Sequence, residues 1–306
     1  MIITLTGNNH FLIQGELSRL IADFVTKFTD MGLQRLDGEE VEYDQIREAL
    51  QSLPFLTSKK LVVLRNPSAN KEFVEKFEKL FSDLPETTDV IIHESKLDKR
   101  SVYYKFLKKT TDYKEYNELD ENALGKWLIG QAKGQGGSLN STDARYLSTR
   151  MGLNQQLLSN ELAKLLAYNP NISRESIELL TEPTPQSTIF QLVDAVFAGN
   201  TKKALQIYSE QRAAKVEPLA IIGMLAWQLH ILAVIITAGS RSDAAIASEA
   251  KISPYVVRKS RAIAQAIPLP RIKQLISDLL DLDVSLKTTS VNPDDALQHY
   301  LLTLSQ

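Results

Sequence analysis

The first stretch of the sequence that could do chemistry is the turn after an apolar run at residues 2–6, which reads TGNNHFLIQ. A phosphate-binding loop needs the pattern Gly-x-x-x-x-Gly-Lys-Ser/Thr, because backbone amides cradle the phosphates, the lysine neutralises them and the hydroxyl holds Mg²⁺. Counted from Gly7, the positions of the second glycine, the lysine and the hydroxyl are taken by Leu12, Ile13 and Gln14. We therefore expect no bound nucleotide, no cofactor and no ATP hydrolysis from this degenerate loop, which consists of Gly7, Asn8 and Asn9.

The remaining residue types that could form a catalytic or metal site are scattered. The run DVIIHES ends in Glu94 without the adjacent acid that would help to hold a metal ion. The histidines show no metal-ligand spacing, and His230 lies in the most apolar segment, where a hydrogen-bonded core histidine is expected. The absence of cysteine excludes disulfides, thiolate zinc sites and cysteine nucleophiles. We expect no catalytic residue and no metal site.

An apolar turn is the strongest candidate for a binding site. In the stretch QSLPFLTSKK, four bulky apolar residues follow a charged amphipathic segment and precede polar residues 57–60; they are Leu53, Pro54, Phe55 and Leu56. Such side chains are unfavourable in water, so a soluble protein usually buries them. Leu53 and Phe55 either fold back as core against the neighbouring helix and strand or protrude to bind a partner. The residues alone leave both readings open.

Two basic segments could meet the phosphates of a nucleic acid. The first, KLDKRSVYYKFLKK, places its cations around two tyrosines that could stack on bases; these cations are Lys96, Lys99, Arg100, Lys105, Lys108 and Lys109. The second, at residues 246–264, imitates a helix-turn-helix and carries Arg258, Lys259 and Arg261. Taken alone, the first segment is better explained as a solvated helix whose tyrosines pack inward. A helix pair with a tight turn is generic, so the second segment by itself is a weak indication of DNA binding.

The pattern of apolar residues, which indicates the secondary structure that positions these segments, changes at residue 120. Up to residue 119, short apolar runs at 2–6, 33–36, 60–65 and 89–94 alternate with amphipathic segments, which predicts an α/β domain with a mostly parallel sheet. Asp120 can cap a helix that the glycines of KGQGGS end, and only helical patterns follow. A turn-rich segment at 181–188 suggests a linker. We therefore predict three domains, at residues 1–119, 120–182 and 183–306, the last two all-α.

Composition limits the class of protein further. The 306 residues are 43% apolar and carry a formal net charge of −2, which argues against a protein that coats nucleic acid by bulk charge. The N-terminal segment lacks the features of a signal peptide, which fits a cytoplasmic protein. The apolar stretch at 221–238 is interrupted by Gly223, Gln228 and His230, so we expect a buried helix and no membrane partner.

The order of several motifs resembles the delta subunit family of bacterial DNA polymerase III, a component of the sliding-clamp loader. The similar motifs run nearly end to end: GNNHFLI, LPFLTSKKLVVLRN, KLDKRSVYYKFLKK, SNELAKLLAY, IFQLVDAVFAGNTKKAL, PYVVRKSRAIAQA and DLDVSLKTTSVNPDDALQHYLL. The family likewise lacks a working phosphate loop. No single motif is specific, but their order and spacing together are.

The resemblance implies an AAA+-like α/β domain with a degenerate nucleotide site, a small helical lid and a helical collar. It implies that the collar joins other loader subunits (gamma/tau and delta-prime), that the apolar turn at residues 53–56 binds the β sliding clamp and helps to open it, and that the basic segments face primed DNA. It also implies a subunit without catalytic activity of its own inside the DNA-directed DNA polymerase III holoenzyme, a nucleotidyltransferase complex. Its place would be the cytoplasm, at the nucleoid.

Two other functions compete with this one. An ATPase subunit of the same loader would need the missing glycine, lysine and hydroxyl of the phosphate loop. A helix-turn-helix regulator would use residues 246–264 and would leave the first 240 residues without a role. The delta-prime family carries a zinc-binding cysteine cluster, and this chain has no cysteine.

Overall fold

The computed structural model describes residues 1–304, apart from the side chains of residues 185 and 186, and the chain separates into two compact units. The first unit is Met1–Leu119 and the second begins at Asp120. Each unit has its own hydrophobic core. A further division of the helical part near residue 182 stays a prediction.

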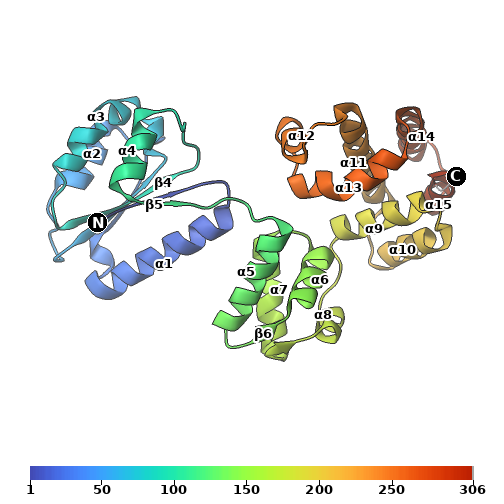
Figure 1. Ribbon diagram of the computed structural model, residues 1–306, viewed down its shortest axis with the longest axis horizontal. Coiled ribbons are helices and arrows are strands. Elements are labelled where there is room, and N and C mark those ends of the chain that lie inside the picture. Colours follow the sequence, from blue (N-terminus) through green and yellow to red (C-terminus); the bar gives the residue numbers. More distant parts are fainter. Residues whose placement is uncertain (305–306) are drawn as a thin grey trace. The chain divides into compact units, whose positions relative to one another are not determined.

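The first unit is built on a parallel five-stranded sheet (Figure 1). Its strands lie in the order β2-β3-β4-β1-β5, and all four neighbouring pairs are parallel. Their bounds are β1 Ile2–Thr6, β2 Leu33–Asp37, β3 Lys60–Arg65, β4 Thr88–Glu94 and β5 Asp112–Glu115. Because β1, β3 and β4 are buried on both faces, they read as continuous apolar runs.

Helices cover both faces of this sheet, as Figure 1 shows. Alternate residues of β3 separate the two cores: Leu61 and Val63 pack with helix α1, whereas Val62 and Leu64 pack with the helices of the other face. The bounds are α1 His10–Phe28, α2 Tyr43–Gln51, α3 Lys71–Ser82 and α4 Val102–Thr110, with the short 3₁₀ turns η1 Asp30–Gly32 and η2 Pro67–Ala69. All parallel strands end at one edge, where binding sites of such sheets usually form.

The second unit is helical. Its first helices are α5 Glu121–Gly134, α6 Ser141–Met151, α7 Gln155–Tyr168 and α8 Arg174–Leu180. The later helices are α9 Pro185–Phe197, α10 Thr201–Ala213, α11 Pro218–Ala238, α12 Asp243–Ala250, α13 Pro254–Ala266, α14 Leu269–Thr288 and α15 Pro293–Leu304. Asp120 caps α5 through a hydrogen bond that its carboxylate accepts from the Ala123 amide at 2.8 Å, as predicted. The later helices share one large apolar core.

Helix α11 lies at the centre of that core. Among residues 1–304 it is the one helix long and apolar enough to cross a membrane, and 44% of its most apolar window is buried in the protein. It contacts five helices of the same unit: α9, α12, α13, α14 and α15. These contacts are those of a core helix.

The predicted fold class, an α/β domain with a parallel sheet followed by helical domains, is confirmed. Three details differ from the prediction. The sheet has a fifth strand, β5, and the helical part contains a two-stranded parallel pair, β6 Ser138–Leu139 with β7 Asn171–Ile172. The predicted linker at 181–188 is shorter, because α9 already begins at Pro185.

Candidate interaction site

Three of the four residues of the apolar turn are exposed to solvent. We call Leu53, Pro54, Phe55 and Leu56 the apolar loop. Phe55 is 94% exposed, Leu53 72% and Leu56 67%, although most phenylalanine and leucine side chains in a folded protein are buried. Pro54 is partly buried and fixes one φ angle of the loop. Of the two readings that the sequence left open, the geometry is that of the protruding loop.

The loop begins where helix α2 ends, beside a buried lysine. Ser52 is the C-cap of α2, and its N–H donates to the Glu48 carbonyl at 2.9 Å. Lys60, the first residue of β3, is only 4% exposed. Its ammonium donates to the Ala49 carbonyl at 2.6 Å and to the Ser52 hydroxyl at 2.9 Å. Burial lowers the pKa of Lys60 from its ordinary value.

The loop ends beside the C-terminus of helix α1. The hydroxyl oxygen of Thr57 lies 3.0 Å from the carbonyl oxygen of Phe28, the last residue of α1, and 2.9 Å from that of Lys59. The turn after α1 packs so closely here that a Cβ atom on Gly32 would lie 2.6 Å from the Lys59 oxygen and 2.8 Å from the Thr57 methyl carbon. Only glycine fits this approach without a shift of the backbone. The neighbouring Met31 is 71% exposed.

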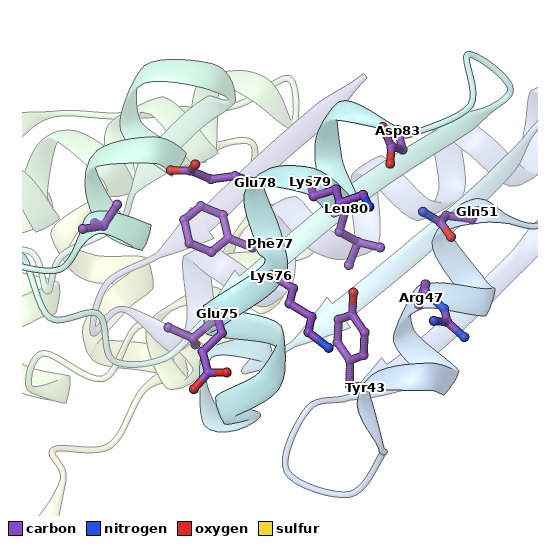
Figure 2. Close-up of a pocket in the computed structure, with 12 residues that line it drawn as sticks. Tyr43, Arg47, Gln51, Glu75, Lys76, Phe77, Glu78, Lys79, Leu80 and Asp83 are labelled. Carbon is purple, nitrogen blue, oxygen red and sulfur yellow. The ribbon is translucent and has the colours of Figure 1, made fainter.

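A groove of about 970 Å³ opens between α2 and α3, next to the start of the loop. Figure 2 shows Tyr43, Arg47 and Gln51 from α2 facing Lys76 and Leu80 from α3. The Lys76 ammonium lies 5.0 Å from the centre of the Tyr43 ring. The walls carry both acidic and basic side chains, so the groove has no single sign of charge. This groove was not predicted from the sequence, because its lining combines buried residues of α2 and α3 with exposed charged residues of the same helices.

The degenerate phosphate loop is filled by the chain itself. The Asn9 N–H, which would point at a phosphate, donates to the Tyr116 carbonyl at 3.0 Å, and the Asn9 side chain caps α1 at the Leu12 amide. Asn8 accepts a hydrogen bond from the Glu118 N–H at 2.8 Å. Gly7 has a φ of +117°, and a Cβ atom there would lie 2.0 Å from the Tyr116 oxygen. The segment after β5 therefore occupies the Asn9 N–H and the Asn8 side chain of this loop.

The buried acid at the end of β4 also forms hydrogen bonds within the protein. Glu94 is 1% exposed, and its two oxygens accept hydrogen bonds from the Ser68 N–H at 2.9 Å and the Ser68 hydroxyl at 2.7 Å. Burial raises its pKa to about 6, although the hydrogen bonds from Ser68 act in the opposite direction. The neighbouring His93 is also buried, and burial lowers its pKa. Among residues 1–304, no three histidines or acids gather where they could hold a metal ion.

The first basic segment splits into an exposed part and a paired part. Lys105, Lys108 and Lys109 are exposed on α4, at a spacing that places them on one helix face. Lys96 and Arg100 are exposed in the loop before α4, and Lys99 is bound to Glu115 at 2.9 Å. Tyr103 is 2% exposed and packs edge-on against two phenylalanines of α3, so it cannot stack on a base.

The second basic segment forms two helices joined by a short turn, as predicted, but its cations are mostly engaged. Arg261 of α13 donates to Asp243 of α12 at 2.6 Å. The Lys259 ammonium lies 4.4 Å from the centre of the Phe190 ring of α9 and is half-buried, which lowers its pKa. Arg258 is exposed. Of the three cations named for this segment, Arg258 is therefore the one that faces solvent, and Lys251 at the turn is exposed as well.

A second groove, of about 500 Å³, lies between α11 and α14 and is largely apolar. Its exposed apolar residues include Leu219, Ile276 and Leu280. His230 lines the same groove and is exposed, so the prediction of a core histidine at this position was wrong. The apolar surroundings of His230 in the sequence belong to both the buried and the outward faces of α11.

Comparison with known proteins concerns the fold and the family of this chain. The five-stranded parallel sheet, followed along the chain by an all-helical region, is a fold that this chain shares with a solved clamp-loader protein. The solved structure of the Bacillus subtilis DNA clamp loader delta protein superposes with a TM-score of 0.85 at 22% identity, over 99% of this chain and 95% of that chain. That likeness concerns the fold.

The family follows from the sequence comparisons. The family described as DNA polymerase III, delta subunit, matches residues 4–117, and the one described as the C-terminal domain of this subunit matches residues 186–304. DNA polymerase III subunit delta of Bacillus subtilis (strain 168) is 24% identical over 317 residues, which cover 98% of this chain and 91% of that protein. The chain belongs to the DNA polymerase III delta subunit family, whose members are components of the holoenzyme.

Proposed function

We propose that this chain is the clamp-binding subunit of a sliding-clamp loader and that it grips a β sliding clamp through the apolar loop. The observation that carries the proposal is the exposure of three bulky apolar side chains within four consecutive residues of the first unit. A contiguous exposed apolar patch of this kind marks a protein interaction site. Each side chain contributes about 1.5–3 kcal/mol when a partner buries it fully.

Opening a ring-shaped clamp requires no bond chemistry in this chain. A ligand shifts a conformational equilibrium only by its differential affinity for the two states, so the chain must bind the open ring more tightly than the closed one. We infer no ATP hydrolysis here, because the Tyr116 carbonyl accepts from the Asn9 N–H and the Glu118 N–H donates to the Asn8 side chain of the degenerate loop. An ATPase of the same loader would need these groups for phosphates, and a nucleotide-binding assay distinguishes the two functions.

The helical unit is the part that we propose to join the other loader subunits. The apolar groove between α11 and α14 supports this role, because Leu280 and Leu219 are 59% and 47% exposed there. The contacts that Arg261 and Lys259 make within the unit weigh against a helix-turn-helix regulator. For a loader of this kind we propose a location in the cytoplasm, at the nucleoid.

The decisive experiment measures affinity for the β clamp with Leu53 and Phe55 replaced by Ala. Loss of two buried side chains corresponds to about 3–6 kcal/mol, or a 10²–10⁴-fold weaker Kd. The matched control is Leu179→Ala, because Leu179 is 68% exposed on α8 and lies outside the loop. A folded double variant that binds the clamp as tightly as the parent chain would contradict the proposal.

The exposed lysines of α4 are proposed to face primed DNA in the assembled loader. Reversing the charge of Lys105 and Lys108 should weaken DNA-stimulated clamp loading and reduce its dependence on salt. With fewer phosphate contacts, binding to DNA releases fewer counterions. Reversal of Lys202 and Lys203, exposed on α10, is the control for the change in net charge. If clamp loading by both variants and by the parent chain depends equally on salt, α4 does not contact DNA in the loader.

A further inference from the structure

The apolar loop is held at both ends by groups that complete the C-termini of two helices. The last four carbonyls of a helix have no partner within the helix, and a cation or another donor near them is stabilising. At the start of the loop, the Lys60 ammonium takes the Ala49 carbonyl, whose partner in a longer helix would have been the N–H of Leu53. Lys60 therefore ends α2 and lets the chain turn outward at Leu53.

The other end uses the same principle on a different helix. The Thr57 hydroxyl lies within hydrogen-bond distance of the carbonyl of Phe28, at the end of α1. Gly32 lets the following turn approach the Thr57 methyl group and the Lys59 carbonyl closely. The four residues between these two attachments make up the whole apolar loop, and three of them are its exposed side chains.

We propose that Lys60 and Thr57 are positioning residues that hold the apolar loop in the conformation that binds the clamp. This inference rests on the proposed function of the loop. It also explains how a solvent-exposed apolar turn can keep one conformation. A free turn with these side chains would collapse onto nearby apolar surface, because burial lowers its free energy. Fixed ends prevent this collapse, and they reduce the conformational entropy that binding would otherwise cost.

Lys60 is suited to this task because its charge is buried and its two acceptors are neutral. The Ala49 carbonyl and the Ser52 hydroxyl are the groups that satisfy its ammonium, so losing either acceptor leaves a buried charge with fewer partners. The neighbouring Lys59 differs: its side chain is 38% exposed, and its ammonium lies 3.7 Å from Asp89. The two adjacent lysines thus provide a matched pair, one inside the attachment and one outside it.

The test compares Lys60→Met with Lys59→Met, and Thr57→Val with Thr57→Ser, in the full chain. Lys60→Met removes the donor and Thr57→Val removes the hydroxyl, and each should weaken clamp binding about tenfold, as expected when about one more residue must be ordered on binding. Lys59→Met keeps the attachment and Thr57→Ser keeps the hydroxyl, so both should bind within about twofold of the parent chain.

A second measurement separates positioning from a general loss of stability. Amide hydrogen exchange of residues 52–57 in the free chain should become faster in Lys60→Met and Thr57→Val, while the amides of strands β1 and β4 keep their protection. If Lys60→Met does not fold, the comparison of Thr57→Val with Thr57→Ser decides alone.

The outcomes of the two proposals are distinguishable. If Leu53→Ala with Phe55→Ala abolishes clamp binding while folded Lys60→Met and Thr57→Val bind like the parent, the positioning role is overturned and the clamp-binding loop stands. If the alanine variant binds normally, the clamp-binding function fails, and the positioning role for it fails with it. Both proposals are supported if Lys60→Met and Thr57→Val bind the clamp more weakly and exchange the loop amides faster, while Lys59→Met and Thr57→Ser behave like the parent chain.

Discussion

Replacing Glu94 by Gln should stabilise the first unit at neutral pH and remove a pH dependence that the carboxyl group causes. Glu94 is buried at the end of β4, and this burial raises its pKa from 4.5 to about 6. The folded chain therefore binds this proton more tightly than the unfolded chain does. Stability is greatest where the group is protonated in the folded protein, and it declines as the pH rises from about 4.5 to about 6.

The size of the effect follows from the two pKa values. The interval from 4.5 to about 6 corresponds to about 2 kcal/mol at about 1.4 kcal/mol for each pH unit, and the whole penalty is present above pH 6. Glutamine carries no charge, and its amide oxygen can still accept the hydrogen bond from the Ser68 N–H. Glu94→Gln should therefore match the parent near pH 4.5 and exceed its stability by about 2 kcal/mol at pH 8.

The assay is urea denaturation of both chains between pH 4.5 and pH 8. Other carboxyl groups contribute equally to the two chains, so the difference in unfolding free energy isolates Glu94. Trp127 and Trp227 lie in the second unit, so their fluorescence follows that unit alone, whereas circular dichroism follows both. The change should appear only in the transition that fluorescence does not report.

Glu16→Gln is the opposite control. The hydrogen bond from Arg19 is the main cause that holds the pKa of Glu16 at about 2. Its ionised form therefore stabilises the folded chain above pH 4.5, and this contribution is lost as the pH falls toward about 2. The reasoning on Glu94 is refuted if Glu94→Gln differs from the parent by the same amount at every pH, or if it is less stable at pH 8.

Three further changes test the packing. In the free chain, Leu53→Ala with Phe55→Ala should change the unfolding free energy by less than about 0.5 kcal/mol, because both side chains are exposed; thermal unfolding measures this. Phe73→Ala should cost about 3–5 kcal/mol in urea denaturation, because Phe73 is fully buried among aromatic rings, and a loss below 1 kcal/mol would contradict that packing. Ser260→Ala should cost about 1–3 kcal/mol by removing the acceptor of the buried Gln228 amide, and adding Gln228→Met should recover most of it in the same assay.

The sequence predicted strands β1 to β4 of the main sheet and missed the edge strand β5 and the small pair of strands β6 and β7. Strands β1, β3 and β4 are buried on both faces, so their apolar runs were visible. Strand β5 reads DYKE and lies at the sheet edge with partly exposed side chains, so its pattern resembles a loop. The pair β6 and β7 has two residues in each strand, too few for any periodicity.

The candidate site divides in the same way. The apolar loop was found because four bulky residues at a turn conflict with ordinary burial. Its attachments were not found, because Lys59 and Lys60 are equivalent in the sequence, and only the register of β3 against β4 decides which ammonium points inward. The hydroxyl of Thr57 and the close approach at Gly32 likewise depend on helix α1, which lies about 30 positions earlier in the chain.

The attachment of the apolar loop at both ends limits how far it can reach. Five peptide steps separate Ser52 from Thr57, and a fully extended chain covers about 3.5 Å for each, or about 17 Å in all. Because the loop leaves the domain at Ser52 and returns at Thr57, its tip rises no more than about 8 Å above these two residues. A pocket that receives Phe55 must lie within that height plus one side chain, so the body of the partner has to come almost into contact with the α/β domain. If the loop binds a ring-shaped clamp as proposed, the connection between the domain and the ring is therefore short, and a movement of the domain displaces the ring with little slack.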